Sequence, residues 1–318
     1  MTPGPEALPA VLVEAFASGP CTGNGAAVVL LKQPMQATRM QALARSLRQS
    51  ETACLLESPQ GWLLRWFTPS CEVPLCGHAT LAALLALGHW GRLSAGERLG
   101  LHSRSGVLEV GLDPVRAGWG SLVLPSSPLQ PSQAPPLLLD LLERHQLGPL
   151  LGFWGSALGY SVALLESQAP LATLPCPAAE LDGDLGRGLV LMQSLADETI
   201  ALEGEPADYQ LRFFAPGLGI DEDPVTGSAH ALVAPWWQER LGRARVVGWQ
   251  CSDRPGGMVC EVAPSGMIRL FGSGHLLWDG TLRTASASGS RPAVGASPPA
   301  PLNSGDPWSE WLTATHCG

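Results

Sequence analysis

The chain contains one pattern twice, as LRWFTPSCEVPLCGHATLAALLAL at residues 64–87 and as LRFFAPGLGIDEDPVTGSAHALVAPWW at residues 211–237. The opening segments of the two copies match at an offset of 147 residues (64 to 211). The later segments match at an offset of 150, so that Gly77 corresponds to Gly227. An internal repeat of this kind predicts two structurally equivalent halves, each with one copy.

Each copy predicts the same local structure. A strand rich in aromatic residues ends at a proline, because proline cannot continue a central ladder. A short loop with an acidic residue and a second proline follows. Glycine, at Gly77 or Gly227, then opens a run of alanine and leucine. Since this run has no polar face, we expect a buried helix in each half.

The starts of these two helices are candidate ligand sites. The first N–H groups of a helix have no partner within the helix. Glycine lets a ligand approach these N–H groups closely. The helix dipole adds about 0.3–1 kcal/mol for each contact with an anion. Two such ends could hold one carboxylate between them, or both could be helix starts that bind nothing.

Four motifs in this order carry a resemblance: VEAFASGPCTGNGAAVVLL (13–31), SETACLLE (50–57), CGHAT (76–80) and EDPVTGSAH (222–230). Together they resemble the phenazine-biosynthesis PhzF-like family, most closely its animal branch of phenazine biosynthesis-like domain-containing proteins. The match runs from about Val11 to about Leu282. The resemblance implies the α+β fold of diaminopimelate epimerase. In that fold two pseudo-symmetric domains each wrap a curved mixed sheet around a central helix, and the active site lies in the cleft between them.

This resemblance divides the chain into an N-terminal half at residues 11–125 and a C-terminal half at residues 137–283. The segment between them is rich in proline, serine and glutamine, which is typical of an interdomain connection. Residues 1–10 are expected to be a loose lead. Residues 284–318 are rich in alanine, serine, glycine and proline, and we expect a disordered tail.

Two local predictions concern the second half. Pro235 lies near the middle of the expected second helix, where proline costs about 3 kcal/mol or bends the helix. We therefore expect a kink or an early stop there. Gly256-Gly257 is predicted to be a turn, and residues 259–262 and 267–271 a hairpin.

Composition excludes several classes of protein. The 318 residues are enough for two cores, and 45% hydrophobic with 15% charged residues is typical of a globular chain. The net charge of −9 argues against binding to nucleic acid and, more weakly, against anionic membranes. No apolar run approaches the ~20 residues of a membrane helix, and no signal pattern is present. We therefore expect a cytoplasmic protein without nucleic-acid or membrane partners.

The chain has eight cysteines and no CxxC pair, so free and mostly buried thiols are expected. Cys71, Cys76 and His78 offer three potential metal ligands. A fourth ligand is missing and the spacing does not fit a zinc knuckle. The sequence therefore predicts no metal site, and the resemblance implies no cofactor.

Glu51 lies at the mouth of an apolar strand, where a carboxylate is usually a solvated strand end. By resemblance, Glu51 is the general acid/base. Burial would raise the pKa of this carboxyl group by desolvation. A carboxyl group shifted towards neutrality can both accept and return a proton.

The resemblance adds His78 and Asp223 as catalytic residues and Gly77, Gly227 and Ser228 as substrate-binding residues. Without it, Asp223 followed by proline would predict only a turn. His78 would hydrogen-bond the substrate or orient Glu51. Because it opens a helix, we expect it to be neutral.

Epimerases of this fold that use no cofactor need a thiol at each of the two helix starts. Here the first start has Cys76, but the equivalent second position is Thr226. A threonine hydroxyl is too weak an acid to replace a thiol. A single base, Glu51, fits a 1,3-proton shift, the isomerisation that the bacterial phenazine enzyme performs on dihydro-3-hydroxyanthranilate.

The expected function is therefore a cofactor-independent isomerase that acts on a small carboxylic acid. A homodimer is implied by the resemblance alone. The alternative is a non-catalytic metabolite-binding or protein-interaction module on the same fold. A lyase or hydrolase that uses the same carboxylate is a third, weaker reading.

Overall fold

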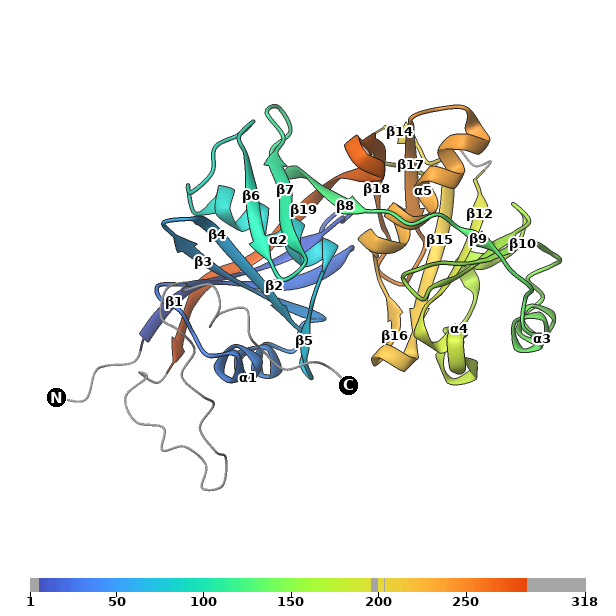
Figure 1. The fold of residues 1–318 in the computed structure, drawn as a ribbon, viewed down its shortest axis with the longest axis horizontal. Helices are drawn as coiled ribbons and strands as arrows, with labels where there is room; N and C mark the ends of the chain where they lie inside the picture. Colours follow the sequence, from blue (N-terminus) through green and yellow to red (C-terminus); the bar gives the residue numbers. More distant parts are fainter. Residues whose placement is uncertain (1–5, 196–199, 203, 285–318) are drawn as a thin grey trace, which may run out of the picture.

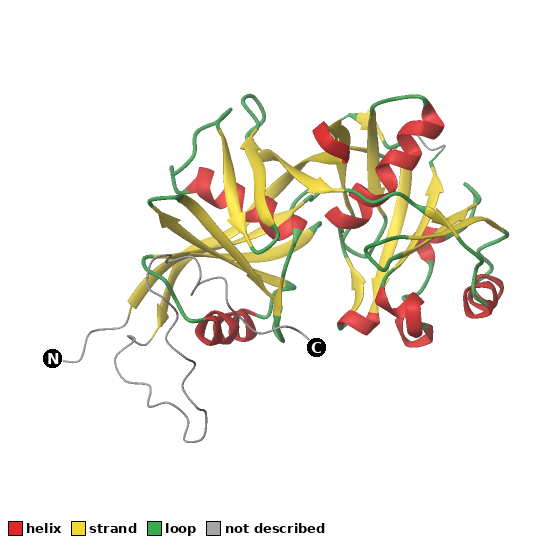
Figure 2. Ribbon diagram, viewed as in Figure 1, coloured by secondary structure: helices red, strands yellow, loops and turns green. Residues whose placement is uncertain are grey.

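The structure is a computed structural model that describes residues 6–195, 200–202 and 204–284. Figure 1 shows two lobes side by side, each a curved set of strands around one helix. Strands predominate in both lobes, as Figure 2 shows. The expected α+β, epimerase-like fold is confirmed. Within the described ranges, no helix is long and apolar enough to cross a membrane.

The first lobe is built around helix α2 (Gly77–His89), whose residues 77–84 are all buried. Its strands pair in the order β1-β2-β3-β4-β6-β7-β8, and the pairs β2–β3 and β4–β6 are parallel. The bounds are β1 (Glu6–Ala15), β2 (Asn24–Leu31), α1 (Ala37–Leu47), β3 (Glu51–Ser58), β4 (Gly61–Phe67), β5 (Glu72–Val73), β6 (Arg98–Ser103), β7 (Gly106–Leu112) and β8 (Trp119–Pro125).

The second lobe is built around helix α5 (Gly227–Leu241). Its strands pair in the order β10-β11-β12-β15-β17-β18-β19, and the pairs β11–β12 and β15–β17 are parallel. The bounds are β9 (Gln130–Pro131), α3 (Pro136–Arg144), β10 (Leu150–Gly155), β11 (Ser161–Leu165), α4 (Gly183–Arg187), β12 (Leu189–Ser194), β13 (Ala201–Leu202), β14 (Glu205–Pro206), β15 (Tyr209–Ala215), β16 (Ile220–Asp223), β17 (Arg245–Gln250), β18 (Gly256–Ala263) and β19 (Met267–Thr284).

The two lobes therefore repeat the same strand order with the parallel pairs in the same places. The repeat in the sequence also forms the same contact twice. Arg65 makes two hydrogen bonds of 2.7 Å to the Glu72 carboxylate. Arg212 binds Glu222 in the same way, at 2.7 and 2.5 Å. Each pair ties the aromatic strand to the loop before the central helix, so each helix starts from an equivalent frame.

Strand β19 joins the two lobes. Its first part pairs with β18 of the second lobe and with β8 of the first, from Met267↔Pro125 to Ser273↔Trp119. Its last part, residues 274–284, pairs with β1. In Figure 1 this strand crosses from one lobe into the other. The end of the predicted C-terminal half thus belongs to the sheet of the first lobe.

Some local predictions are wrong. Helix α5 continues for six residues beyond Pro235, so the early stop does not occur, and the kink at Pro235 stays a prediction. Gly256 and Gly257 are the first residues of β18 instead of a turn, because they pair with Gln250 and Trp249. Residues 6–10, part of the expected loose lead, belong to β1. The predicted tail lies outside the described residues, apart from Thr284.

The cysteines follow the expectation in part. Within the described ranges six cysteines are free, and four of them are buried: Cys54, Cys76, Cys251 and Cys260. Cys71 is disulfide-bonded, which differs from the expected free thiol.

Candidate active site

The two central helices meet at their N-termini. A Cβ atom added to Gly77 would lie 3.4 Å from the Cα of Gly227, and one added to Gly227 would lie 3.5 Å from the Cα of Gly77. The residues just before these glycines, Cys76 and Thr226, are the N-caps of the two helices. The junction therefore brings the N-termini of two helices, whose first N–H groups have no partner within the helix, to one point, as the repeat predicts.

Glu51 lies at this junction. It is the first residue of β3, beside Ala26 of the parallel strand β2, and it is only 6% exposed. Its Oε2 atom lies 3.0 Å from Nε2 of His78, the second residue of α2. In the described part of the chain, this oxygen accepts no hydrogen bond of good geometry. The carboxylate is thus held by its contact with His78.

Asp223 reaches the junction from the other lobe. Its carboxylate accepts hydrogen bonds of 2.6 Å from the hydroxyl of Thr226 and from the side-chain amide of Asn24. The same amide nitrogen lies 3.1 Å from Nδ1 of His78. Asn24 therefore connects the acidic residue of the second lobe to the histidine of the first.

The pKa values of Glu51 and His78 differ from the sequence prediction. Burial raises the pKa of Glu51, but the charge of His78 and hydrogen bonds from His78 and Ser50 lower it by more, so the net shift is downward. Burial lowers the pKa of His78, but Cys76 and Glu51 raise it well above its ordinary value. The predicted raised carboxyl pKa and neutral histidine are both wrong, because each group has the other as a close partner.

Asp223 shows the upward shift that was expected of Glu51. Burial raises its pKa to about 6, against the lowering influence of His78 and of the hydrogen bonds from Thr226 and Asn24. The site thus holds two carboxyl groups with different proton affinities. Such a divergence is common where acid and base roles are divided between two groups.

Cys76 also belongs to this cluster. Its Sγ atom lies 3.5 Å from Nδ1 of His78, and ligand atoms of Glu51, Cys76 and His78 all lie within 4.8 Å of one another. Burial, followed by the charge of Glu51, raises the pKa of the Cys76 thiol. A zinc or iron ion would need that thiol as a thiolate and would compete with the contact between Glu51 and His78. This donor set therefore fits an acid/base site better than a metal site.

The structure brings the predicted residues together and adds several that the sequence analysis did not single out. Ser228, the second residue of α5, contacts the hydroxyl of Tyr160 at 3.3 Å. Gln250 accepts the backbone N–H of Thr226 and donates to the carbonyl of Asp223. Asn24 stood within a quoted motif, whereas Tyr160 and Gln250 stand in no motif. Only the pairing of distant strands brings them to the junction.

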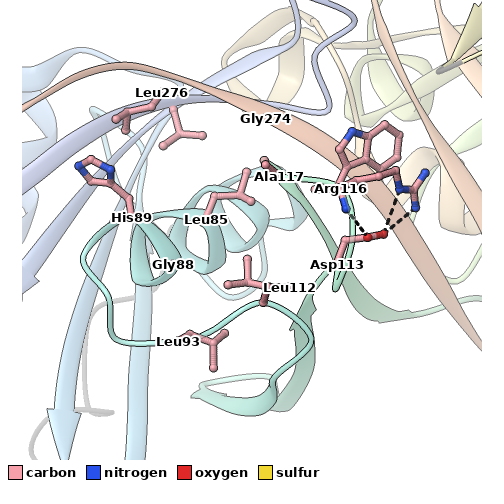
Figure 3. Close-up of a pocket in the computed structure, with 14 residues that line it drawn as sticks. Leu85, Gly88, His89, Leu93, Leu112, Asp113, Arg116, Ala117, Gly274 and Leu276 are labelled. Carbon is pink, nitrogen blue, oxygen red and sulfur yellow. Dashed lines mark hydrogen bonds and ion pairs between the residues drawn. The ribbon is translucent and has the colours of Figure 1, made fainter.

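Neither of the next two pockets is lined by Glu51, His78 or Asp223. One of about 340 Å³ lies at the C-terminal end of α2 and is drawn in Figure 3, which shows Leu85, Leu112 and His89 around it and Asp113 bonded to Arg116. A larger one, of about 550 Å³, is lined by residues that include Tyr160 and Arg187. The first is at the opposite end of α2 from Glu51, so it is not part of the site.

Two repeated lobes with buried acid/base groups at the junction of their central helices define an epimerase-like protein. The family model described as phenazine biosynthesis-like protein matches residues 13–147 and 156–271. The chain therefore belongs to this family, PhzC-PhzF.

The relatives agree with this assignment. The chain is 37% identical over 273 residues to the protein named Uncharacterized isomerase PA3578 of Pseudomonas aeruginosa, with 85% of this chain and 97% of the relative covered. It is 32% identical over 298 residues to Phenazine biosynthesis-like domain-containing protein 2 of Mus musculus, with 86% and 99% covered. A crystal structure of a PhzF-family protein from Enterococcus faecalis matches with a TM-score of 0.76 and 30% identity, with 87% and 99% covered.

Proposed function

We propose that this protein is an isomerase that moves a proton between two carbons of a small carboxylic acid, without a cofactor. One observation carries the proposal. The Glu51 carboxylate lies beside His78 where two helix N-termini meet. The helix N–H groups would bind the substrate carboxylate, and Glu51 would reach a C–H group beside it.

In the proposed reaction, Glu51 Oε2 accepts a proton from one carbon of the substrate. The C–H bond breaks, and its electron pair is delocalised towards the substrate carboxylate. The helix N–H groups stabilise this developing negative charge. Glu51, whose carboxyl proton exchanges with solvent, then returns a proton to a second carbon, and the double bond shifts. Nothing is oxidised or reduced, and the protein ends in its starting state.

The lowered pKa of Glu51 fits the first step, because the carboxylate is ionised before substrate binds. Bringing a substrate carboxylate close adds a second negative charge, which raises the proton affinity of Glu51. His78 remains within 3.0 Å of Oε2 and would hold the carboxyl group in position while it carries the proton.

A two-thiol racemase is disfavoured by the same geometry. Thr226, the counterpart of Cys76, donates its hydroxyl proton to Asp223 at 2.6 Å. Its hydroxyl group is therefore occupied by this hydrogen bond, and it is a much weaker acid than a thiol. The second helix start therefore offers no thiol that could act as the second base.

Deuterium incorporation tests the proposal. The protein, its Glu51→Gln variant and the control Glu57→Gln are incubated in heavy water with a panel of small unsaturated cyclic acids. Glu57 lies on the same strand, is exposed and forms an ion pair with Arg92 at 3.5 Å. We expect mass shifts with the native protein and with Glu57→Gln, and none with Glu51→Gln.

The outcome separates catalysis from binding. Labelling by Glu51→Gln at the native rate would exclude Glu51 as the base. If acids bind but none is labelled by any variant, the protein is a metabolite-binding module, the alternative function. Binding is followed in the same samples by isothermal titration calorimetry, and folding by circular dichroism.

A further inference from the structure

The register of the two sheets shows which residues of the second lobe correspond to Glu51 and its neighbours. In the first lobe, β3 pairs with β4 as Thr52↔Phe67. In the second lobe, β12 pairs with β15 as Leu189↔Phe214. Phe67 and Phe214 are 147 residues apart, as in the repeat. Thr52 and Leu189 are therefore equivalent. Glu51 precedes Thr52 and Gly188 precedes Leu189, so Gly188 is the counterpart of Glu51.

The neighbouring strand is related in the same way. In the first lobe Ala26 of β2 lies beside Glu51. In the second lobe Ser161 pairs with Leu189, which places Tyr160 beside Gly188. The large and the small residue have thus exchanged strands, glutamate beside alanine in one lobe and glycine beside tyrosine in the other.

The tyrosine ring fills the space that the glycine leaves. A Cβ atom on Gly188 would lie 2.5 Å from Cδ1 of Tyr160, so no larger residue fits at Gly188 while the ring is there. The ring also packs on Phe213, with the ring centroids 4.8 Å apart. Its backbone is fixed by the side chain of Ser156, which bonds both the N–H and the carbonyl of Tyr160. Tyr160 is therefore held in one position from three sides.

The contacts at the helix starts are equivalent as well. Glu51 contacts the second residue of α2, His78, at 3.0 Å. Tyr160 contacts the second residue of α5, Ser228, at 3.3 Å. His78 and Ser228 are related by the repeat offset of 150. The phenol group of Tyr160 thus takes, in the second lobe, the place that the carboxylate of Glu51 takes in the first.

We propose that Tyr160 is the substrate-contacting hydrogen-bond donor on the side of the junction opposite Glu51. This inference rests on the proposed function and deepens it. When Glu51 removes the proton, the charge spreads to the oxygens of the substrate carboxylate, and the Tyr160 O–H hydrogen-bonds to one of them. The tyrosine keeps its proton throughout. The site therefore selects planar, conjugated carboxylic acids, whose carbanion places charge on that oxygen.

The protonation state of Tyr160 agrees with a donor role. Burial raises the pKa of its phenol group, and the charge of Asp223 raises it further, against the lowering influence of the hydrogen bond with Ser228. The group therefore stays an O–H donor at neutral pH.

The test uses the fact that the chain has only two tyrosines, Tyr160 and Tyr209. With ¹³Cζ-labelled tyrosine, the NMR spectrum contains two resonances, and Tyr160→Phe identifies one of them. Benzoate is the probe, because it is a planar conjugated carboxylate, and cyclohexanecarboxylate is its saturated control. We expect benzoate to shift the Tyr160 resonance, more than the saturated acid does. Tyr209 is buried against His230 and should not move.

Kinetics provide the second readout. Tyr160→Phe keeps the ring contacts with Gly188 and Phe213 and removes only the hydroxyl. We expect kcat for deuterium incorporation to fall roughly a hundredfold with KM nearly unchanged, since the donor acts on charge that develops in the reaction. A tyrosine with a purely structural role would leave kcat unchanged.

The two proposals can fail separately. Glu51→Gln should lose turnover, but benzoate should still shift the NMR resonance of Tyr160 in this variant. A Tyr160 resonance that does not respond to millimolar benzoate, or native turnover in Tyr160→Phe, would overturn the assignment of Tyr160. A shift without turnover in the native protein would overturn only the isomerase.

Discussion

The two lobes share a frame but differ in the residues that face the junction. The frame is kept in both copies, since the pairs Arg65–Glu72 and Arg212–Glu222 hold equivalent strands and loops together. The junction residues have diverged, from His78 to Ser228 and from Cys76 to Thr226. Ion pairs that orient a helix can be repeated, because both helices need the same support. The proposed proton shift on one face would use different groups on its two sides.

The largest effect on stability is expected at the repeated Arg–Glu ion pairs, where the two lobes are most alike. Removing one partner of a buried ion pair leaves an uncompensated charge and costs about 3–5 kcal/mol. We expect the loss of stability in Arg65→Met to lie at the lower end of this range, because Glu72 still has Arg104 as a partner at 3.2 Å. Arg212→Met should lie at the upper end, because the carbonyls of Leu171 and Leu174 also lose a donor. Urea unfolding monitored by tryptophan fluorescence measures both.

The control for these variants is Arg92→Met, which removes an exposed pair with Glu57 and should cost at most about 1 kcal/mol. A cost below that value for either buried arginine would show that the shared frame does not stabilise the lobes. Adding Glu72→Leu to Arg65→Met should recover part of the loss, because the unpaired charge is then removed.

A pH-dependent difference is expected at Asp223, whose counterpart in the first lobe is the uncharged Val73. The folded pKa of Asp223, about 6, exceeds its ordinary value of 3.8, so the folded state binds this proton more tightly than the unfolded state. The resulting stability is complete below about pH 4 and is lost as the pH rises through 6. As the pH rises from 4 to neutral, the free energy of unfolding of Asp223→Asn should therefore increase relative to that of the native protein by up to about 3 kcal/mol.

Urea unfolding at several pH values measures this difference, with the exposed Asp221→Asn as the control. A constant difference between Asp223→Asn and the native protein across this range would contradict the raised pKa. We also expect Asp223→Asn to have reduced turnover, since it changes the contact with Asn24.

The smallest effect is expected at Cys76. Cys76→Thr makes the N-caps of the two central helices identical, and we expect turnover within a few-fold of the native value. The raised pKa keeps the thiol protonated, so it does not act as the base. Deuterium incorporation measures this variant as well. Complete loss of labelling would instead indicate a catalytic thiol, despite the missing partner at Thr226.

Local sequence signals predicted the frame well. Apolar runs behind Gly77 and Gly227 predicted two buried central helices, because a helix without a polar face must be covered on all sides. The repeat predicted two equivalent lobes. The sequence predicted either a kink or a stop at Pro235, and the helix does not stop there, since tertiary packing can outweigh the cost of one proline. The pairing of residues 274–284 with the first strand of the chain has no local signal.

The sequence alone predicted the two lobes, because the repeat is visible along the chain, and its resemblance to the PhzF-like family predicted the residues that gather at the helix starts. Only the tertiary structure decided the protonation of Glu51 and His78. Their pKa values depend on burial and on a partner 3.0 Å away, and neither is visible in spacing. The pairing of Tyr160 with Ser228, 68 residues apart, was decided in the same way, by strand register.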